Sequence, residues 1–125
     1  MIIYILSKHR SSYSTSRLYE ETVRRGHKVR VIDHTQCELK IGAKSHVFYQ
    51  GAELEKPDYI IPRIGASATF YGSNVVRQFE MMNVKTVVTA DGLLKSRDKL
   101  RASQNMILNN IEVPKTYFPT SKMKD

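Results

Sequence analysis

An arginine and a glycine follow a predicted core strand of the chain. Tyr59-Ile60-Ile61 is apolar, and Pro62 should end the strand, so Arg63 and Gly65 come directly after it. Ligands of open α/β sheets bind beyond the carboxyl ends of the strands. A guanidinium offers a planar fork for a carboxylate or phosphate. Arg63 and Gly65 are therefore candidates for binding an anionic substrate, and the alternative is that Arg63 pairs with a nearby acidic residue.

Two further places carry side chains that suit a binding site. Phe70-Tyr71-Gly72 begins the next predicted helix, where the aromatic rings either line a cleft or belong to the core. Asp98-Lys99 lies near the start of a later helix, where a lysine can meet a phosphate and Asp98 can orient it. A lysine on a helix surface is the common alternative for Lys99.

The loop after the first strand lies where doubly wound folds bind phosphates. It is rich in serine and contains Lys8 and Arg10, but it has no glycine between Ser7 and Ser14. The dinucleotide fingerprint needs glycines for close backbone approach, so binding of NAD or FAD is disfavoured. The hydroxyls and the two cations could contact another anion, and a solvated polar loop is the alternative.

Metal and nucleophile signatures are weak in this sequence. The four histidines, His9, His27, His34 and His46, have no metal-ligand spacing and are expected at the surface. Cys37 is the only cysteine, which excludes an intrachain disulfide and fits a reducing compartment. We therefore assign no catalytic and no metal-binding residue.

Length and composition favour one compact α/β domain. The chain has 125 residues, of which 41 % are hydrophobic, enough for a core. A formal net charge of +8 favours acidic partners such as phosphates, acidic peptides or nucleic acid, unless the basic residues only form a solvated surface. No apolar run approaches the roughly 18 residues of a membrane span. We therefore expect a cytoplasmic protein without a membrane partner.

The order of predicted elements defines the fold class. A strand at 2–6, a helix at about 15–25 capped by Ser14 and stopped by Gly26, and a strand at 29–32 form a βαβ unit with parallel strands. We place the apolar face of this helix on four residues: Leu18, Tyr19, Thr22 and Val23.

The second half of the chain continues the pattern. Alternating segments at 37–41 and 45–49 predict an antiparallel hairpin, followed by a turn at Gln50-Gly51. After the strand at 59–62 we expect a helix, a core strand and a last helix, at 69–82, 86–88 and 96–109.

Several side chains are assigned roles in these later elements. The two helices have predicted apolar faces made by Val75, Val76, Phe79 and Met82, and by Leu100, Ile107, Leu108 and Ile111. We also expect Arg77 to pair with Glu80, and Asp91 to cap a short helical turn. The predicted fold is α/β, a mainly parallel four-stranded sheet with helices on both faces and a small antiparallel hairpin.

Taken together, these residues resemble the N-terminal, pre-ATP-grasp domain of RimK-type ATP-dependent alpha-L-glutamate ligases. The similarity covers nearly the whole chain in order. It is carried by residues 5–7, 24–27, 32–33, 61–65, 69–72, 77–81, 97–101, 104 and 114–116. The resemblance implies a pre-ATP-grasp domain at 1–96, and a linker helix with the start of the ATP-grasp domain at 97–125.

The resemblance also implies an activity. Enzymes of this family use ATP and Mg²⁺ (or Mn²⁺) to activate a carboxylate as an acyl phosphate, which the amine of glutamate then attacks. The acceptor is the C-terminus of a ribosomal protein, another acidic peptide or poly-α-glutamate. The ATP-grasp domain carries the metal ligands and most catalytic groups, so we expect these 125 residues alone to be inactive and to bind no cofactor.

Site residues follow from the same likeness. Arg63, Gly65 and Tyr71 match a motif that faces the interdomain cleft and binds substrate, and Lys99 matches a position that contacts ATP. A homo-oligomer is a further expectation. One alternative is a stand-alone, non-catalytic module that binds an acidic peptide or regulates a separate ATP-grasp partner. A nucleic-acid-binding domain is disfavoured because base-stacking motifs are absent.

Overall fold

The fold was obtained as a computed structural model, which describes residues 1–115 and 117. Thirteen elements follow one another along the chain: β1 (Ile2–Ser7), α1 (Tyr13–Arg24), β2 (Lys28–Ile32), η1 (His34–Gln36), β3 (Cys37–Lys40), β4 (His46–Tyr49), β5 (Ala52–Glu53), β6 (Tyr59–Arg63), η2 (Ala66–Ala68), α2 (Thr69–Met81), β7 (Lys85–Thr86), α3 (Ala90–Arg97) and α4 (Lys99–Leu108). The predicted segment 97–125 lies partly outside the described residues. No described helix is long and apolar enough to cross a membrane.

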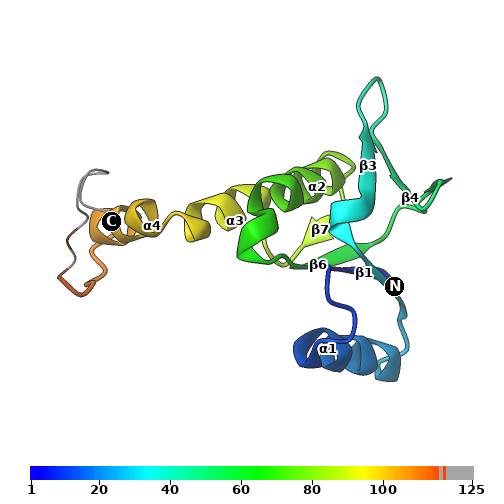
Figure 1. The fold of residues 1–125 in the computed structure, drawn as a ribbon, viewed down its shortest axis with the longest axis horizontal. Helices are drawn as coiled ribbons and strands as arrows, with labels where there is room; N and C mark the ends of the chain where they lie inside the picture. The colour runs from blue at the N-terminus through cyan, green and yellow to red at the C-terminus, as the bar shows by residue number, and fades with distance from the viewer. Residues whose placement is uncertain (116, 118–125) are drawn as a thin grey trace.

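The main sheet has four parallel strands in the order β2-β1-β6-β7. In the register of the central pair, the last residue of β1, Ser7, lies beside the last residue of β6, Arg63. Figure 1 shows α1 and α2 on opposite faces of this sheet. The structure therefore confirms the predicted α/β class, the parallel four-stranded sheet and the helices on both faces.

Alternate residues of β1 contact the two helices. The ring of Tyr4 packs edge-on against Phe79 of α2, with ring centroids 6.3 Å apart. Ser7 faces the other side, where its hydroxyl lies 3.0 Å from the Thr15 hydroxyl of α1. This period of two along the strand divides the interior into a large apolar layer under α2 and a more polar layer under α1.

The predicted apolar face of α2 is confirmed. Val75, Val76 and Phe79 are fully buried, and Met82 packs against the same cluster. The expected pair between Arg77 and Glu80 is wrong. Both side chains instead fix α3: Arg77 forms an ion pair with Asp91 at 3.4 Å, and a Glu80 oxygen accepts the N–H of Ala90 at 2.8 Å.

Helix α1 differs from its prediction at its start and on its buried face. Its N-cap is Ser12 rather than Ser14, because the Ser12 side chain accepts the N–H of Thr15. Thr15 and Thr22 are its buried residues, whereas Tyr19 and Val23 of the predicted face are exposed. The helix therefore contacts the sheet through small hydroxyl side chains.

The predicted hairpin is confirmed, and it carries an additional strand. β3, β4 and β5 form a three-stranded antiparallel sheet. The expected turn at Gln50-Gly51 joins β4 to β5, and both residues have positive φ. Gln78 of α2 attaches this sheet to the body by donating to the carbonyl oxygens of Lys40 and His46, at 2.9 and 3.1 Å.

The two strands at the β7 side of the sheet differ from the prediction. Pro62 does not end β6, which continues to Arg63. Proline has no backbone N–H to donate to a neighbouring strand. This costs no hydrogen bond to β7, because β7 ends opposite Ile60, before Pro62 is reached. β7 itself is only Lys85–Thr86, and Val87 and Val88 are exposed rather than part of a core strand.

The predicted last helix at 96–109 is two helices. α3 ends at Arg97, Asp98 is extended, and α4 begins at Lys99. The Asp98 side chain caps α4 by accepting the N–H of Arg101 at 3.0 Å, and Thr89 rather than Asp91 caps α3. The residues expected on the face of the last helix are exposed: Leu100, Ile107, Leu108 and Ile111.

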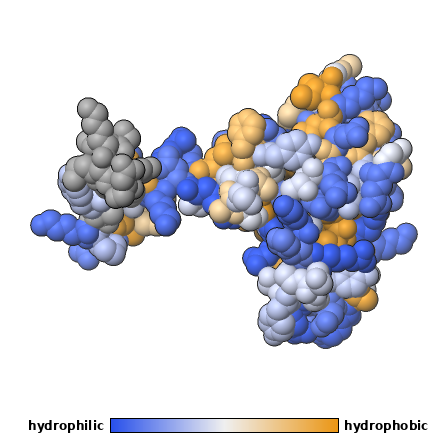
Figure 2. All heavy atoms as spheres, viewed as in Figure 1, coloured by the Kyte–Doolittle hydropathy of each residue, from blue (hydrophilic) through white to orange (hydrophobic). Residues whose placement is uncertain are grey.

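We call residues 2–97 the body and residues 99–115 the arm. α3 packs against α2 and belongs to the body. Figure 1 shows α4 projecting away from the sheet, and Figure 2 shows a narrow, hydrophilic connection between arm and body.

Candidate functional site

A pocket of about 460 Å³ opens at the carboxyl edge of the parallel sheet. We call it the rim pocket. It lies where β1 and β6 end, and the N-terminus of α1 and the C-terminal half of α3 close its sides. Its lining consists of Ser7, His9, Ser12, Ser14, Thr15, Pro62, Arg63, Ile64, Gly65, Val88, Leu93, Ser96 and Arg97. This is the edge at which open α/β sheets bind their ligands.

Arg63 brings a positive charge to this pocket as the last residue of β6. One of its terminal nitrogens donates to the hydroxyl of Ser14 at 3.0 Å. Among the described residues, no carboxylate forms an ion pair with Arg63. The alternative, in which Arg63 forms an ion pair with a nearby acidic residue, is therefore not seen in the described part of the chain.

Arg97 contributes a second guanidinium to the pocket from α3. It is the last residue of α3, and it donates to the carbonyl oxygen of Ile64, the residue after β6. No described carboxylate pairs with it either. Sequence reasoning did not single out Arg97, because its link to Ile64 joins residues that are far apart in the chain.

Hydroxyl groups and a helix N-terminus complete the polar wall. The Thr15 hydroxyl lies 3.0 Å from that of Ser7 and 2.9 Å from that of Ser12. The N-terminus of α1 adds positive partial charge. The serine-rich loop thus brings hydroxyls to the rim pocket, whereas Lys8 and Arg10 do not line it. The wall is suited to a carboxylate or a phosphate.

The structure brings together only two of the four predicted site residues. Arg63 and Gly65 both line the rim pocket. The Tyr71 hydroxyl instead donates to the carbonyl oxygen of Cys37, and burial near that residue raises the pKa of Tyr71. Lys99 is exposed at the start of α4 and does not line the pocket.

Cys37 and His34 are both buried, and neither lines this pocket. Burial raises the pKa of the Cys37 thiol to about 12, which keeps the thiol protonated and unreactive. His34 is fully buried, so the expectation of a surface histidine is wrong for it. Its two ring nitrogens have no described partner, and burial lowers its pKa, as do Lys8 and His9, while Asp33 opposes the shift.

The described residues do not fit a metal ion. No three or more histidine, cysteine, aspartate and glutamate side chains among them are grouped closely enough to hold one. The divalent cation implied by the family resemblance therefore has no set of ligands in residues 1–115 and 117.

Comparison with known proteins places the chain in a family. A family model described as "RimK PreATP-grasp domain" matches residues 1–93. The chain belongs to this family. The resemblance seen in the sequence is thereby confirmed, whereas the predicted division into 1–96 and 97–125 stays a prediction.

Curated relatives extend the match beyond the pre-ATP-grasp domain. A probable alpha-L-glutamate ligase of Cellvibrio japonicus is 50 % identical over 119 residues, which is 94 % of this chain and 40 % of that relative. One from Syntrophotalea carbinolica is 48 % identical over 122 residues, which is 97 % of this chain and 40 % of the relative. The chain therefore spans well under half the length of these relatives, and the larger part of each lies outside the match.

Proposed function

We propose that this chain is the pre-ATP-grasp domain of an ATP-dependent alpha-L-glutamate ligase and that its rim pocket binds a carboxylate of the substrates. The observation that carries the proposal is the pair Arg63 and Arg97, which face one pocket without a described acidic partner. Two exposed guanidiniums that line one pocket without a described carboxylate partner favour a bound anion.

In the proposed reaction, ATP activates a carboxylate as an acyl phosphate, and the amine of glutamate displaces phosphate to form a peptide bond. We place ATP and Mg²⁺ or Mn²⁺ on the ATP-grasp part of the enzyme, as the family resemblance implies. The rim pocket holds either the acceptor or the incoming glutamate by a carboxylate that does not react. The isolated 125-residue chain is therefore inactive.

An acidic peptide is the acceptor that best fits the charge of the chain. The formal net charge of +8 attracts a ribosomal protein with an acidic C-terminus or a growing chain of α-linked glutamates. The side-chain carboxylate of a C-terminal glutamate does not react, and it matches a pocket lined by two guanidiniums. Such a reaction belongs to the cytoplasm, where ATP and these acceptors occur.

The test joins this chain to the part of the Cellvibrio japonicus relative that lies outside the match. The joined protein is incubated with ATP, Mg²⁺, glutamate and a peptide that ends in glutamate, and the peptide mass is followed. We expect successive addition of glutamate residues. Arg63→Ala and Arg97→Ala should each raise the apparent KM for the peptide or for glutamate by about tenfold or more, since a charge-assisted hydrogen bond contributes about 1.5–3 kcal/mol.

Arg25→Ala is the matched control, because Arg25 lies at the other end of α1 and pairs with Glu21 on the surface. Its KM values should equal those of the unmodified joined protein. Unchanged KM values in both pocket variants would exclude the rim pocket as a substrate site. If the joined protein folds and binds ATP but adds no glutamate to any acidic peptide, the proposed activity is wrong.

A further inference from the structure

Strand β2 forms one edge of the parallel sheet, and no described strand pairs with its outer side. The N–H of Lys28 donates to the carbonyl oxygen of Met1 at 3.0 Å, toward β1. Successive residues of a strand direct their main-chain groups to opposite sides, so Val29 and Val31 direct theirs away from β1. Within the described part of the chain, these outward N–H and C=O groups have no hydrogen-bond partner.

A hollow of about 220 Å³ lies against this edge, and we call it the edge pocket. Val29, Arg30 and Val31 of β2 line it, together with Arg10 from the loop before α1 and Tyr49 from β4. None of its described lining residues is acidic. The edge pocket therefore combines open main-chain groups with two guanidiniums.

Both guanidiniums of the edge pocket are available to a ligand. Arg30 lies over the ring of Tyr49, with its central carbon 5.7 Å from the ring centroid, and this contact leaves the N–H groups of the fork free. Arg10 and Arg30 are exposed, and neither forms an ion pair with a described carboxylate. Glu20 lies beside Arg10 in a neighbouring pocket, but it pairs with Arg17 at 2.9 Å.

Two other carboxylates lie near Arg30 without neutralising it. Glu53 and Glu55 line a separate pocket with Lys28 and Arg30. Glu53 forms an ion pair with His46, and no described ion pair joins either glutamate to Arg30. The charge of Arg30 is thus not compensated by direct contact with an acidic side chain of the described residues.

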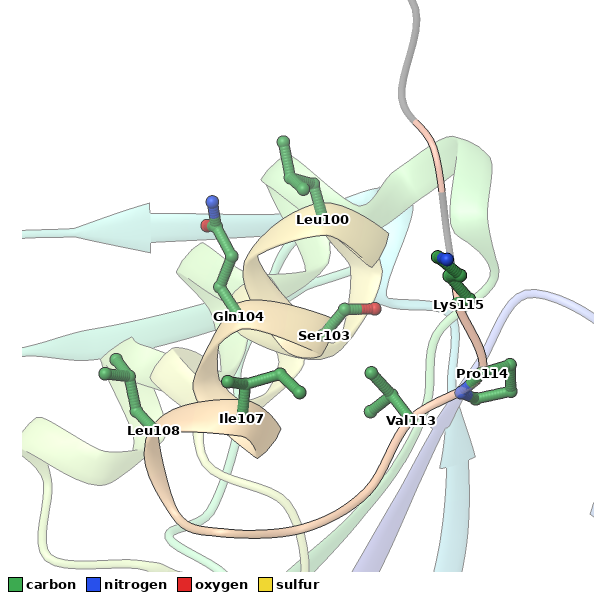
Figure 3. A pocket seen from close by; sticks show the side chains of 8 residues that line it. All are labelled: Leu100, Ser103, Gln104, Ile107, Leu108, Val113, Pro114 and Lys115. Carbon is green, nitrogen blue, oxygen red and sulfur yellow. The ribbon is translucent and has the colours of Figure 1, made fainter.

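Charge separates the edge pocket from the larger groove beside α4. That groove has a volume of about 770 Å³, and Figure 3 shows the side chains of α4 and of the segment at 113–115 that line it. Most of these side chains are apolar, and Lys115 is the one charged residue among the described lining residues. An anionic ligand is therefore attracted to the edge pocket more strongly than to this groove.

We propose that β2 binds an extended acidic peptide, which adds to the parallel sheet as a further strand at the edge pocket. The outward groups of Val29 and Val31 form hydrogen bonds with the main chain of the peptide. Arg10 and Arg30 bind carboxylates of its side chains. Alternate side chains of a strand lie on the same face, so a run of glutamates always presents a carboxylate to this side of the sheet.

Charge and hydrogen bonding decide between the possible occupants of this edge. A second copy of the chain would bring its own Lys28 and Arg30 against the same residues, and the net charge of +8 also opposes such pairing. A nucleic acid has the complementary charge, but its phosphates cannot donate hydrogen bonds to the C=O groups of Val29 and Val31. An acidic peptide satisfies both requirements.

The edge pocket adjoins the rim pocket across one loop. Arg10 lines the edge pocket, whereas His9 and Ser12 of the same loop line the rim pocket. Consecutive Cα atoms are about 3.8 Å apart, so a short peptide can reach both pockets. The identity of the peptide rests on the proposed function: it is the acceptor, with its terminal glutamate in the rim pocket and the preceding glutamates along β2.

The main experiment measures amide hydrogen exchange of the 125-residue chain by NMR, with and without octaglutamate. The amides of Val29 and Val31 should exchange rapidly in the free chain, because they are not part of the ladder. Octaglutamate should slow both by about tenfold or more. The amide of Arg30 is the internal control, because it points toward β1 and its exchange should change little.

The contribution of charge is measured by the affinity of fluorescently labelled octaglutamate. Arg10→Gln and Arg30→Gln should each weaken binding by about threefold, as expected for exposed ion pairs. Arg25→Gln is the matched control, because it removes the same charge from the far end of α1 and leaves Glu21 paired with Arg24. Its affinity should equal that of the unmodified chain.

The contribution of the main chain is measured with octaglutamate methylated at every peptide nitrogen. This peptide keeps its carboxylates but has no N–H to donate, so we expect it to bind at least about tenfold more weakly. Equal affinity of the two peptides, or unchanged exchange of Val29 and Val31 with octaglutamate bound, would overturn strand addition. So would a failure of octaglutamate to bind.

Two further outcomes would assign the edge to another occupant and contradict the proposal. One is an oligonucleotide of equal charge that slows exchange of Val29 and Val31 as much as octaglutamate does. The other is a dimer of the free chain that protects the same two amides without any peptide.

The joined protein separates this inference from the proposed function. Protection of Val29 and Val31 by octaglutamate, with no glutamate addition by the joined protein, would support the edge site and contradict the proposed activity. Glutamate addition with equal KM values for short and long acceptors, and without this protection, would contradict the edge site and leave the proposed function standing.

Discussion

In the body, α2 buries Val75, Val76 and Phe79 completely against the parallel sheet, whereas α4 of the arm buries none of its residues. Both helices carry apolar residues at helical spacing, so their sequence patterns are alike. The two helices differ in what their apolar faces contact. Those of α2 pack into the core of the body, whereas α4 projects into solvent (Figure 1). An apolar stripe therefore predicts that a helix has a partner, but not that the partner belongs to the same compact unit.

Truncation of Phe79 should produce the largest loss of stability. Its side chain is fully buried, so Phe79→Ala leaves a cavity in the main core and should lower the free energy of unfolding by about 3–5 kcal/mol. Urea denaturation measures the change. Phe70→Ala is the control on the same helix, because Phe70 is 78 % exposed, and it should cost far less. Equal losses would contradict the burial described for α2.

Gly72→Ala should have the next largest effect. A Cβ atom at this position would lie 2.5 Å from Cγ2 of Ile64, a buried residue whose carbonyl anchors Arg97. Overpacking of this kind costs about 1–3 kcal/mol, which urea denaturation can measure. Gly42→Ala is the control, because its added Cβ meets only a normal contact at 3.9 Å. A neutral Gly72→Ala variant would show that α2 and Ile64 are packed more loosely than described.

His34 should make the body, and not the arm, sensitive to acid. Its pKa in the folded chain lies below the ordinary 6.5, so the unfolded chain binds the proton more readily. Stability should therefore fall as the pH drops below about 6.5. His34→Leu removes the proton-binding group and should flatten the slope of unfolding free energy against pH. An unchanged slope in this variant would exclude His34 as the cause.

Truncation in the arm should have the smallest effect. In the 125-residue chain, Leu108→Ala should change the free energy of unfolding by no more than about 0.5 kcal/mol, because the side chain is 80 % exposed. Thermal or urea unfolding of the two chains provides the comparison. A loss of several kcal/mol would mean that the arm already has a partner and would remove the contrast with α2.

Most of the body could be predicted because its elements have local signals. The apolar run before Ser7, the stop at Gly26 and the face around Phe79 each follow from neighbouring residues, and the structure confirms them. The break at Asp98 was missed because apolar spacing alone continues across it. An aspartate followed by helix-forming residues is also an N-cap signal, and this signal could have located the break.

The rim pocket was predicted less completely, because it depends on contacts between distant segments. Arg63 could be placed from the end of its strand, but the approach of Arg97 depends on how α3 packs against α2. Burial of His34 likewise results from η1 lying against α2, which no local pattern of charge or apolarity indicates. The sequence therefore did not predict residues whose positions depend on chain topology rather than on a periodic pattern.

A single extended residue, Asp98, joins α3 to α4. With ten residues, α4 is about 15 Å long. A torsional rotation of roughly 10° at Asp98 would therefore swing the far end of α4 by up to about 3 Å. Anything carried on the helix would shift by a similar amount relative to Arg97. The position of α4 relative to Arg97 is thus set by the two backbone angles of Asp98 and does not depend on the four-stranded sheet.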